Sequence, residues 1–330
     1  MREAAPTVGV RDSRSSLKDS ILRDYGSILL LVIICVIMGI LNPRFLSSGN
    51  IINLSKQMIP VGLVALGAMF VMISGGIDLS AGFGVSLSAV LLGVVYLSTN
   101  NLFLAILTAI VTGAIIGSVN GLIITKLGLM PFIATLGTMS AYKGLTYIFS
   151  FGRMAWVKHP VIYFLGGGTV FEIPVSFIFL LIIYFIGYLI LNRCRFGLYV
   201  MAIGSNEKST ILAGINVSLY KMYIYVTAGI LTGFCSVILI SRLEMTAPTI
   251  GGISLLLDAI AATVIGGTSL LGGKGSVKGT FVGVVIITII GNALNLLNIS
   301  PYYRDTFKGL VILGAVFFDR FVSMRGYVAK

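Results

Sequence analysis

The chain has 330 residues, of which 57% are hydrophobic and only 10% are charged, and its mean hydropathy is +1.04. A soluble domain carries about 25% charged residues, so this composition excludes a water-facing globular protein and predicts that most of the surface faces lipid. The formal net charge of +12 does not indicate nucleic-acid binding, because the basic residues fall between apolar runs rather than on one face.

Ten segments approach the roughly 20 apolar residues that a membrane-spanning helix needs. They are 25–41, 51–73, 78–97, 102–126, 131–150, 175–191, 221–241, 254–271, 276–297 and 306–322. The sequence therefore predicts an all-α integral membrane protein of about ten transmembrane helices. A single membrane domain over 25–322 is flanked by an N-terminal tail, 1–24, and a C-terminal tail, 323–330. The N-terminal tail is too polar and too long to be a cleaved signal peptide.

The positions of the basic residues predict the orientation in the membrane. When the ten spans are threaded alternately, most of the 23 Lys and Arg residues fall on the same side as the N-terminus. Cytoplasmic loops are enriched in Lys and Arg, so both termini are predicted to be cytoplasmic. The long loop 192–220 is then also cytoplasmic, and the connection 151–174 lies outside.

Two ten-residue stretches share the pattern GGxxLxxGxG, which indicates an internal duplication. One covers 75–84 and the other 266–275, and each lies between two apolar runs. We interpret their glycines as points where helices break, at Gly75, Gly76, Gly82, Gly266, Gly267 and Gly273. Broken helices in repeats are a feature of transporters, whose path runs between the repeats. The span count makes the copies parallel, and one miscounted helix would make them inverted.

Ionisable side chains inside the membrane are costly, and they are therefore candidates for a translocation path. Asp78 lies in the first glycine stretch, Lys143 in the fifth span and Asp258 near the start of the eighth. Each also has a structural interpretation. Asp78 would cap a broken helix, Asp258 would serve the first turn of its helix electrostatically, and Lys143 would snorkel or pair with an acid.

Three asparagines within apolar runs, Asn120, Asn292 and Asn295, are further candidates for the path. Interhelical hydrogen bonds explain them equally well. The single histidine, His159, has no Cys or His partner at a ligand spacing, so neither a metal site nor a catalytic site is predicted. The second glycine stretch is not a nucleotide-binding P-loop, because Gly273 and Lys274 are followed by glycine instead of Ser or Thr.

The cytoplasmic loop contains the signals of one short helix. Asn206 is placed to be its N-cap, Glu207 suits the positive end of the helix dipole, and Gly214 marks the stop. Such a helix would suit the docking of a partner protein. A plain connecting turn is an equally good interpretation of the same residues.

From about residue 25 onward the chain resembles the inner-membrane permease family of ribose-type ABC importers. The stretches that carry this resemblance are GGIDLS at 75–80, PFIATLG at 131–137, the loop 204–217, LDAIAA at 257–262, GGTSL at 266–270 and GGKG at 272–275. Several such segments in one order are specific when taken together.

The resemblance implies a pore of two permease subunits, identical or paired with a sister permease. It also implies a cytoplasmic partner ATPase and an extracytoplasmic binding protein that delivers a monosaccharide or a similar small polar solute. The chain would be no enzyme and would hold no cofactor, because ATP would be bound by the ATPase. The loop would become the coupling helix, through Gly204, Asn206, Glu207, Ser209, Thr210, Gly214 and Ile215.

Two positions depart from the pattern expected of the family. Ser209 and Thr210 stand where a pair of alanines is expected, a change that would tune the fit to the ATPase. Leu256 stands where an acid is expected two residues before Asp258, which argues against a standard ribose specificity. An ion-coupled secondary transporter is the alternative function, with Asp78 and Asp258 as its coupling groups. The driving force of uptake distinguishes the two.

Overall fold

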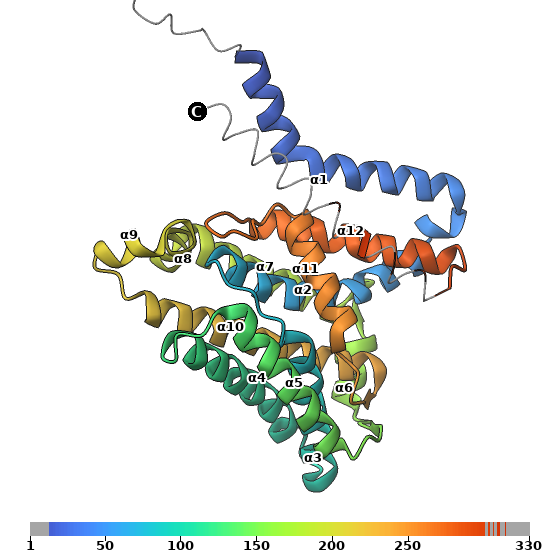
Figure 1. Ribbon diagram of the computed structural model, residues 1–330. Coiled ribbons are helices and arrows are strands. Elements are labelled where there is room, and N and C mark those ends of the chain that lie inside the picture. Colours follow the sequence, from blue (N-terminus) through green and yellow to red (C-terminus); the bar gives the residue numbers. More distant parts are fainter. Residues whose placement is uncertain (1–12, 301–302, 304–305, 307–308, 311–313, 315–330) are drawn as a thin grey trace, which may run out of the picture.

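The computed structural model describes residues 13–300 together with residues 303, 306, 309, 310 and 314 (Figure 1). The first half of the predicted N-terminal tail, most of the tenth span and the whole predicted C-terminal tail therefore lie outside the described residues. Over residues 13–25 the backbone alone is described.

The described part of the chain is mostly helical, and its only strands form two short β ribbons. The helices are α1 (Ser13–Leu41), the 3-10 helix η1 (Pro43–Leu46), α2 (Ser48–Ile73), α3 (Ala81–Thr99), α4 (Leu102–Thr125), α5 (Pro131–Ser150), α6 (Pro160–Gly167), α7 (Val175–Arg193), α8 (Arg195–Ser205), α9 (Glu207–Leu212), α10 (Val217–Leu243), α11 (Gly252–Ile265) and α12 (Val277–Leu296). In the ribbons, β1 (Ala155–Trp156) pairs antiparallel with β4 (Met245–Thr246), and β2 (Thr169–Val170) with β3 (Ile173–Pro174).

The first nine predicted spans each coincide with a helix, so the all-α prediction is confirmed. Among the described residues, six helices are long and apolar enough to cross a membrane, namely α2, α3, α4, α7, α10 and α12. The predicted eighth span, 254–271, extends beyond the end of the helix that the structure shows there. α11 stops at Ile265, because Gly267 takes up a left-handed conformation (φ +85°) that breaks the helix.

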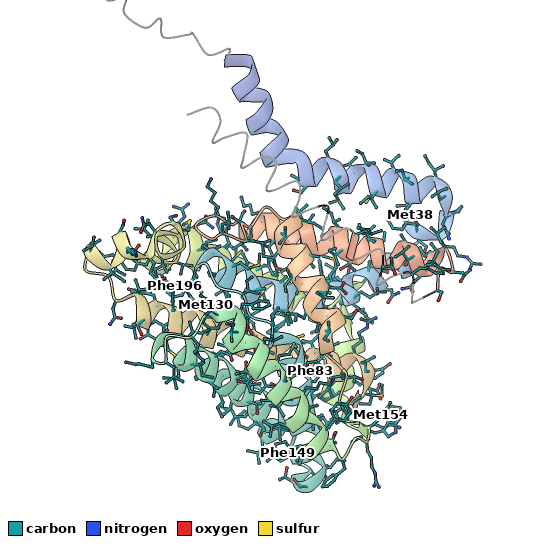
Figure 2. All side chains as sticks on the ribbon, in the orientation of Figure 1. Met38, Phe83, Met130, Phe149, Met154 and Phe196 are labelled. Carbon is teal, nitrogen blue, oxygen red and sulfur yellow. The ribbon has the colours of Figure 1, made fainter. Side chains whose placement is uncertain are left out.

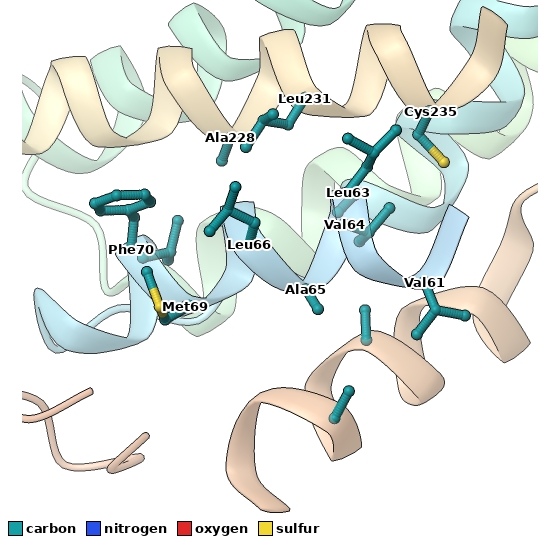
Figure 3. Close-up of a cluster of buried hydrophobic side chains, with 14 of the residues drawn as sticks. Val61, Leu63, Val64, Ala65, Leu66, Met69, Phe70, Ala228, Leu231 and Cys235 are labelled. Atoms are coloured by element: carbon teal, nitrogen blue, oxygen red, sulfur yellow. The ribbon is translucent and has the colours of Figure 1, made fainter. Parts of the chain in front are cut away.

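The centre of the bundle is α2, which is buried without interruption from Met58 to Ile73. Figure 3 shows Leu66 and Phe70 of α2 beside Ala228 and Leu231 of α10. Lipid tails are as apolar as these side chains, so close van der Waals packing rather than exclusion of water holds the helices together. A smaller cluster, which contains Met38 (labelled in Figure 2), joins α1 to α12.

Glycines bring α4 and α10 into backbone contact. A Cβ atom on Gly113 or Gly117 would overlap backbone atoms of α10, and a Cβ atom on Gly229 or Gly233 would overlap backbone atoms of α4. Both pairs have the small-xxx-small spacing that lets membrane helices approach closely. The high glycine content thus serves packing here, as well as helix breaks.

α10 runs from one end of the molecule to the other. Its 27 residues rise about 40 Å at about 1.5 Å per residue, more than the roughly 30 Å of a hydrocarbon core. α9 lies just before its first residue, and Arg242 lies beside its last. The short helices α8 and α9 lie at one edge of the bundle and α6 at the opposite edge (Figure 1).

Candidate functional site

Both glycine stretches end a helix in the same way. The glycines that correspond in the structure are one residue away from those that the sequence pattern pairs. After α2, the amide of Gly75 and the next amide donate to carbonyls three and five residues earlier. After α11, the amides of Gly267 and its successor do the same. Gly75 and Gly267 have φ of +81° and +85°, as the Schellman motif requires. The structural equivalent of Gly75 is therefore Gly267, whereas the sequence pattern pairs it with Gly266.

The two helices that precede the breaks run in the same direction. Thr263 of α11 donates a hydrogen bond to the carbonyl of Ala65 of α2 (3.2 Å), and residues earlier in both helices line one cleft. The prediction that Gly82 breaks a helix is wrong, because Gly82 lies inside α3. Its missing side chain serves packing instead, since a Cβ atom there would overlap the carbonyl oxygen of Gly252 in α11.

The first break, the loop that follows the second break and the end of α8 meet at one point, which we call the glycine junction. It consists of Ile73, Gly75, Gly204, Gly272 and Gly273. The amide of Gly273 donates to the carbonyl of Ile73 (2.8 Å), and a Cβ atom on Gly204 would overlap that same carbonyl oxygen. A Cβ atom on Gly272 would lie 2.8 Å from the Gly204 carbonyl oxygen and 3.0 Å from the Gly75 Cα. The three segments are thus packed backbone against backbone.

The predicted short helix of the 192–220 loop is α9. The prediction of its cap is confirmed, because the Asn206 side chain accepts a hydrogen bond from the Ser209 amide (3.0 Å). Gly214 follows with φ +79°, as predicted for the stop. Glu207 forms an ion pair with Lys221 of α10 (2.8 Å), which ties α9 to the next helix. The sequence did not indicate this ion pair.

α9 presents apolar side chains outward. Leu212 is 87% exposed and Ile211 is 55% exposed. Of the two residues that depart from the family pattern, Ser209 is exposed, whereas Thr210 is buried and donates to the Asn206 carbonyl (2.8 Å). Ser209 is therefore the one of the pair that a docked partner would meet.

Asp78 and Asn120 belong to one buried hydrogen-bond network. An Asp78 carboxylate oxygen accepts from the amide and the hydroxyl of Ser80, at 2.9 and 2.7 Å. Asn120 of α4 donates to the Ser80 hydroxyl (2.8 Å) and accepts from the Thr138 hydroxyl of α5 (2.7 Å). The network ties the first break to two helices, so the structural interpretation of both residues is supported by these contacts.

Asn292 also has structural partners. Its side-chain amide and that of Asn50 donate to each other, at 2.9 and 3.1 Å. Asn50 additionally donates to the Phe45 carbonyl (2.8 Å). The pair therefore fastens the start of α2 to α12, and interhelical hydrogen bonding accounts for Asn292.

Lys143 lies on the exposed side of α5. Its ammonium group is 5.7 Å from the centre of the Phe83 ring, within the range of a cation–π contact. The same helix exposes large apolar side chains, and Met130, just before its start, and Phe149, near its end, are labelled in Figure 2. The Lys143 side chain is therefore exposed in this structure.

Asp258 and Asn295 come together in a cleft of about 360 Å³ between α2, α10, α11 and α12. Its polar lining residues are Gln57, Arg242, Asp258, Thr288 and Asn295, and its other lining residues are Pro60, Val61, Leu255, Ile287 and Gly291. Asp258 is not in the first turn of α11, which begins at Gly252, so its predicted role at the helix start is wrong. Gln57, Arg242 and Thr288 were missed, although each is a polar residue within or at the end of an apolar run.

A family model and several known proteins match this chain over most of its length. A family model described as "Branched-chain amino acid transport system / permease component" matches residues 50–316. The ribose import permease protein RbsC of Bacillus subtilis is 42% identical over 92% of this chain and 94% of its own length. RbsC of Haemophilus influenzae is 38% identical over 92% and 95%. The D-allose transport system permease protein AlsC of Escherichia coli is 33% identical over 91% and 92%. No solved structure matches.

A bundle of apolar helices long enough to cross a membrane, with polar groups inside it, defines a multi-pass membrane protein. The chain belongs to the permease family of ribose-type ABC importers, as its motifs indicated. It is a multi-pass protein of the bacterial cytoplasmic membrane and has a transport role.

Proposed function

We propose that this chain is the transmembrane permease subunit of an ABC importer for a monosaccharide or a similar small polar solute. An extracytoplasmic binding protein delivers the solute, and a partner ATPase drives its passage. Support for a sugar comes from relatives that are named for ribose, allose and arabinose. Support for the coupling comes from the glycine junction.

The junction gives the ATPase a mechanical route into the bundle. In this proposal α9 is the coupling helix, and its exposed residues Ile211 and Leu212 seat in the ATPase cleft. Only Asn206 separates α9 from α8, whose Gly204 is in backbone contact with the first break and with the loop that follows the second. Because no side chain lies between these backbones to change rotamer, a displacement of α8 displaces both segments together. Coupling between two sites requires such an element, whose position both partners bias.

The proposal includes three partners. Both termini and α9 lie on the cytoplasmic side, where ATP is bound by the ATPase and not by this chain. A second permease subunit, identical or a sister chain, faces α5. An ammonium group at the centre of a lipid-facing helix costs about 2.5–3.5 kcal/mol, so the exposed Lys143 fits a watery path between two subunits better than lipid.

The test is to purify the tagged chain from its native membrane and to measure what binds it and what drives uptake. We expect a stoichiometric ATPase, and sugar uptake that stops when ATP is depleted. Uptake that survives ATP depletion and collapses with the ion gradient would replace this proposal with the secondary transporter.

Two variants test the coupling helix. Glu207→Arg replaces the ion pair with Lys221 by a repulsion, and Gly214→Pro removes the flexible stop. An exposed ion pair contributes at most about 1 kcal/mol, so insertion and stability of Glu207→Arg stay close to wild type while uptake is lost. Asn192→Ala, an exposed change at the end of α7 and outside α9, is the control. Wild-type uptake in both test variants contradicts the assignment of α9.

A further inference from the structure

Two internal groupings of polar side chains in the described part of the chain differ in their exposure. Around Asp78 the polar side chains bond one another and are buried. The cleft of Asp258 is open, and Arg242 and Asn295 lie exposed at its mouth. Gln57 and Asp258 are partly buried, and Thr288 is buried. Four helices contribute these five side chains.

We propose that this cleft is a binding site for one uncharged polyhydroxylated solute within a single permease subunit. The inference rests on the proposed function and adds to it a station that the solute occupies during import. The volume of about 360 Å³ lies within the roughly 300–1,000 Å³ typical of small-molecule sites.

The chemistry of the lining matches hydroxyl groups. The Arg242 guanidinium only donates hydrogen bonds, the Asp258 carboxylate accepts them, and the amides of Gln57 and Asn295 do both. A hydroxyl group also does both, so a polyol matches donors and acceptors alike. Among the described lining residues one cation and one anion balance each other, which disfavours a bound ion.

Thr288 independently points to a ligand. It is only 6% exposed, it lines the cleft, and its hydroxyl has no hydrogen-bond partner among the described residues. A buried hydroxyl group is costly to leave unpaired. A solute hydroxyl in the cleft would supply the missing partner. Pro60, Val61 and Ile287 give the cleft an apolar surface for the C–H face of a sugar ring.

The cleft lies at the end of the molecule opposite the coupling helix. Arg242 is at the end of α10 and α9 lies before its start, so the two are separated by about 40 Å along that helix. With α9 on the cytoplasmic side, the cleft is on the side where the binding protein delivers its solute. The station is therefore an entry site.

The first experiment is maleimide labelling of Asn295→Cys in a cysteine-free background, using the full chain in native membranes with its partners. Leu297→Cys is the control, because it is exposed nearby but does not line the cleft. The probes are D-ribose, D-allose and L-arabinose, with phosphocholine as the probe for a lipid headgroup. We expect the sugar that the importer transports to slow labelling of Asn295→Cys and to leave Leu297→Cys unchanged.

The second experiment measures uptake. Asp258→Asn and Thr288→Val should reduce it, the former about tenfold because a charge-assisted hydrogen bond is lost, with ATPase activity retained. Asn192→Ala, outside the cleft, should transport normally. If the wild type imports a sugar but both cleft variants import it equally well and no labelling is protected, the station is refuted and the importer stands. Protection by phosphocholine alone also refutes it. If the wild type imports none of the sugars and none protects, both proposals fail.

Discussion

The variant Gly204→Ala tests how tightly the glycine junction is packed. Gly204 lies in α8, where alanine is intrinsically preferred to glycine by about 0.5–1 kcal/mol. Against this gain, the new Cβ atom would overlap the Ile73 carbonyl oxygen, which is backbone and cannot rotate away. Overpacking costs about 1–3 kcal/mol, and a clash with backbone belongs at the upper end. We expect a net loss of about 2 kcal/mol of stability.

Gly144→Ala is the matched control, because Gly144 is also helical but has no atom within 4 Å of the position of a Cβ atom. It should gain the propensity term alone. The two variants should therefore differ by about 2–3 kcal/mol, or about 5–10 °C in Tm. The assay is thermal unfolding of the purified protein in detergent, paired with uptake measured in vesicles. Equal Tm values for Gly204→Ala and Gly144→Ala would refute the backbone contact.

Three further outcomes are expected from the packing. Asn120→Ala removes two interhelical hydrogen bonds and should lower stability by about 1–2 kcal/mol, whereas Asn192→Ala, exposed at the end of α7, should change it by less than about 0.5 kcal/mol; equal thermal shifts contradict the network. Gly117→Leu should abolish assembly of α4 with α10, seen as loss of folded protein in size-exclusion chromatography, and a folded variant would contradict the contact. Asn292→Ala should lose about 1 kcal/mol through its amide pair, and Asn50→Ala no less, because Asn50 also holds the Phe45 carbonyl.

The helices were predictable because a membrane span leaves a local record in the sequence. A run of about 20 apolar residues is sufficient to locate a span, and capping residues such as Asn206 sharpen its ends. The end of α11 was harder to predict. Two adjacent glycines, Gly266 and Gly267, both permit a left-handed conformation, and the choice between them depends on the hydrogen bonds of the last turn. The same ambiguity shifted the register of the repeat by one residue.

The cleft and the junction were not predictable, because their residues are remote in the chain. Asp258 and Asn295 were candidates only for being polar within apolar runs. Nothing local in the sequence indicated that they share a cleft with Gln57 and Arg242, while Asn292, three residues before Asn295, lies outside the cleft and pairs with Asn50 at the start of α2. Likewise Gly82 resembles the break glycines in the sequence, and only its contact with Gly252 shows that it serves packing.

One helix connects the two proposed sites. α2 carries Gln57 of the cleft near its beginning and ends at Ile73 of the junction, and between them it is buried on all sides. Pro60 removes one backbone hydrogen bond of α2, but neighbours packed against it on all sides leave little room for bending there, so the helix moves as a unit. Displacement of α8 by the ATPase would therefore act at Ile73 and be felt at Gln57. By the reciprocity of coupling, solute bound in the cleft must bias the junction by the same free energy, so occupancy of the station by a sugar would itself alter the affinity of the permease for its ATPase.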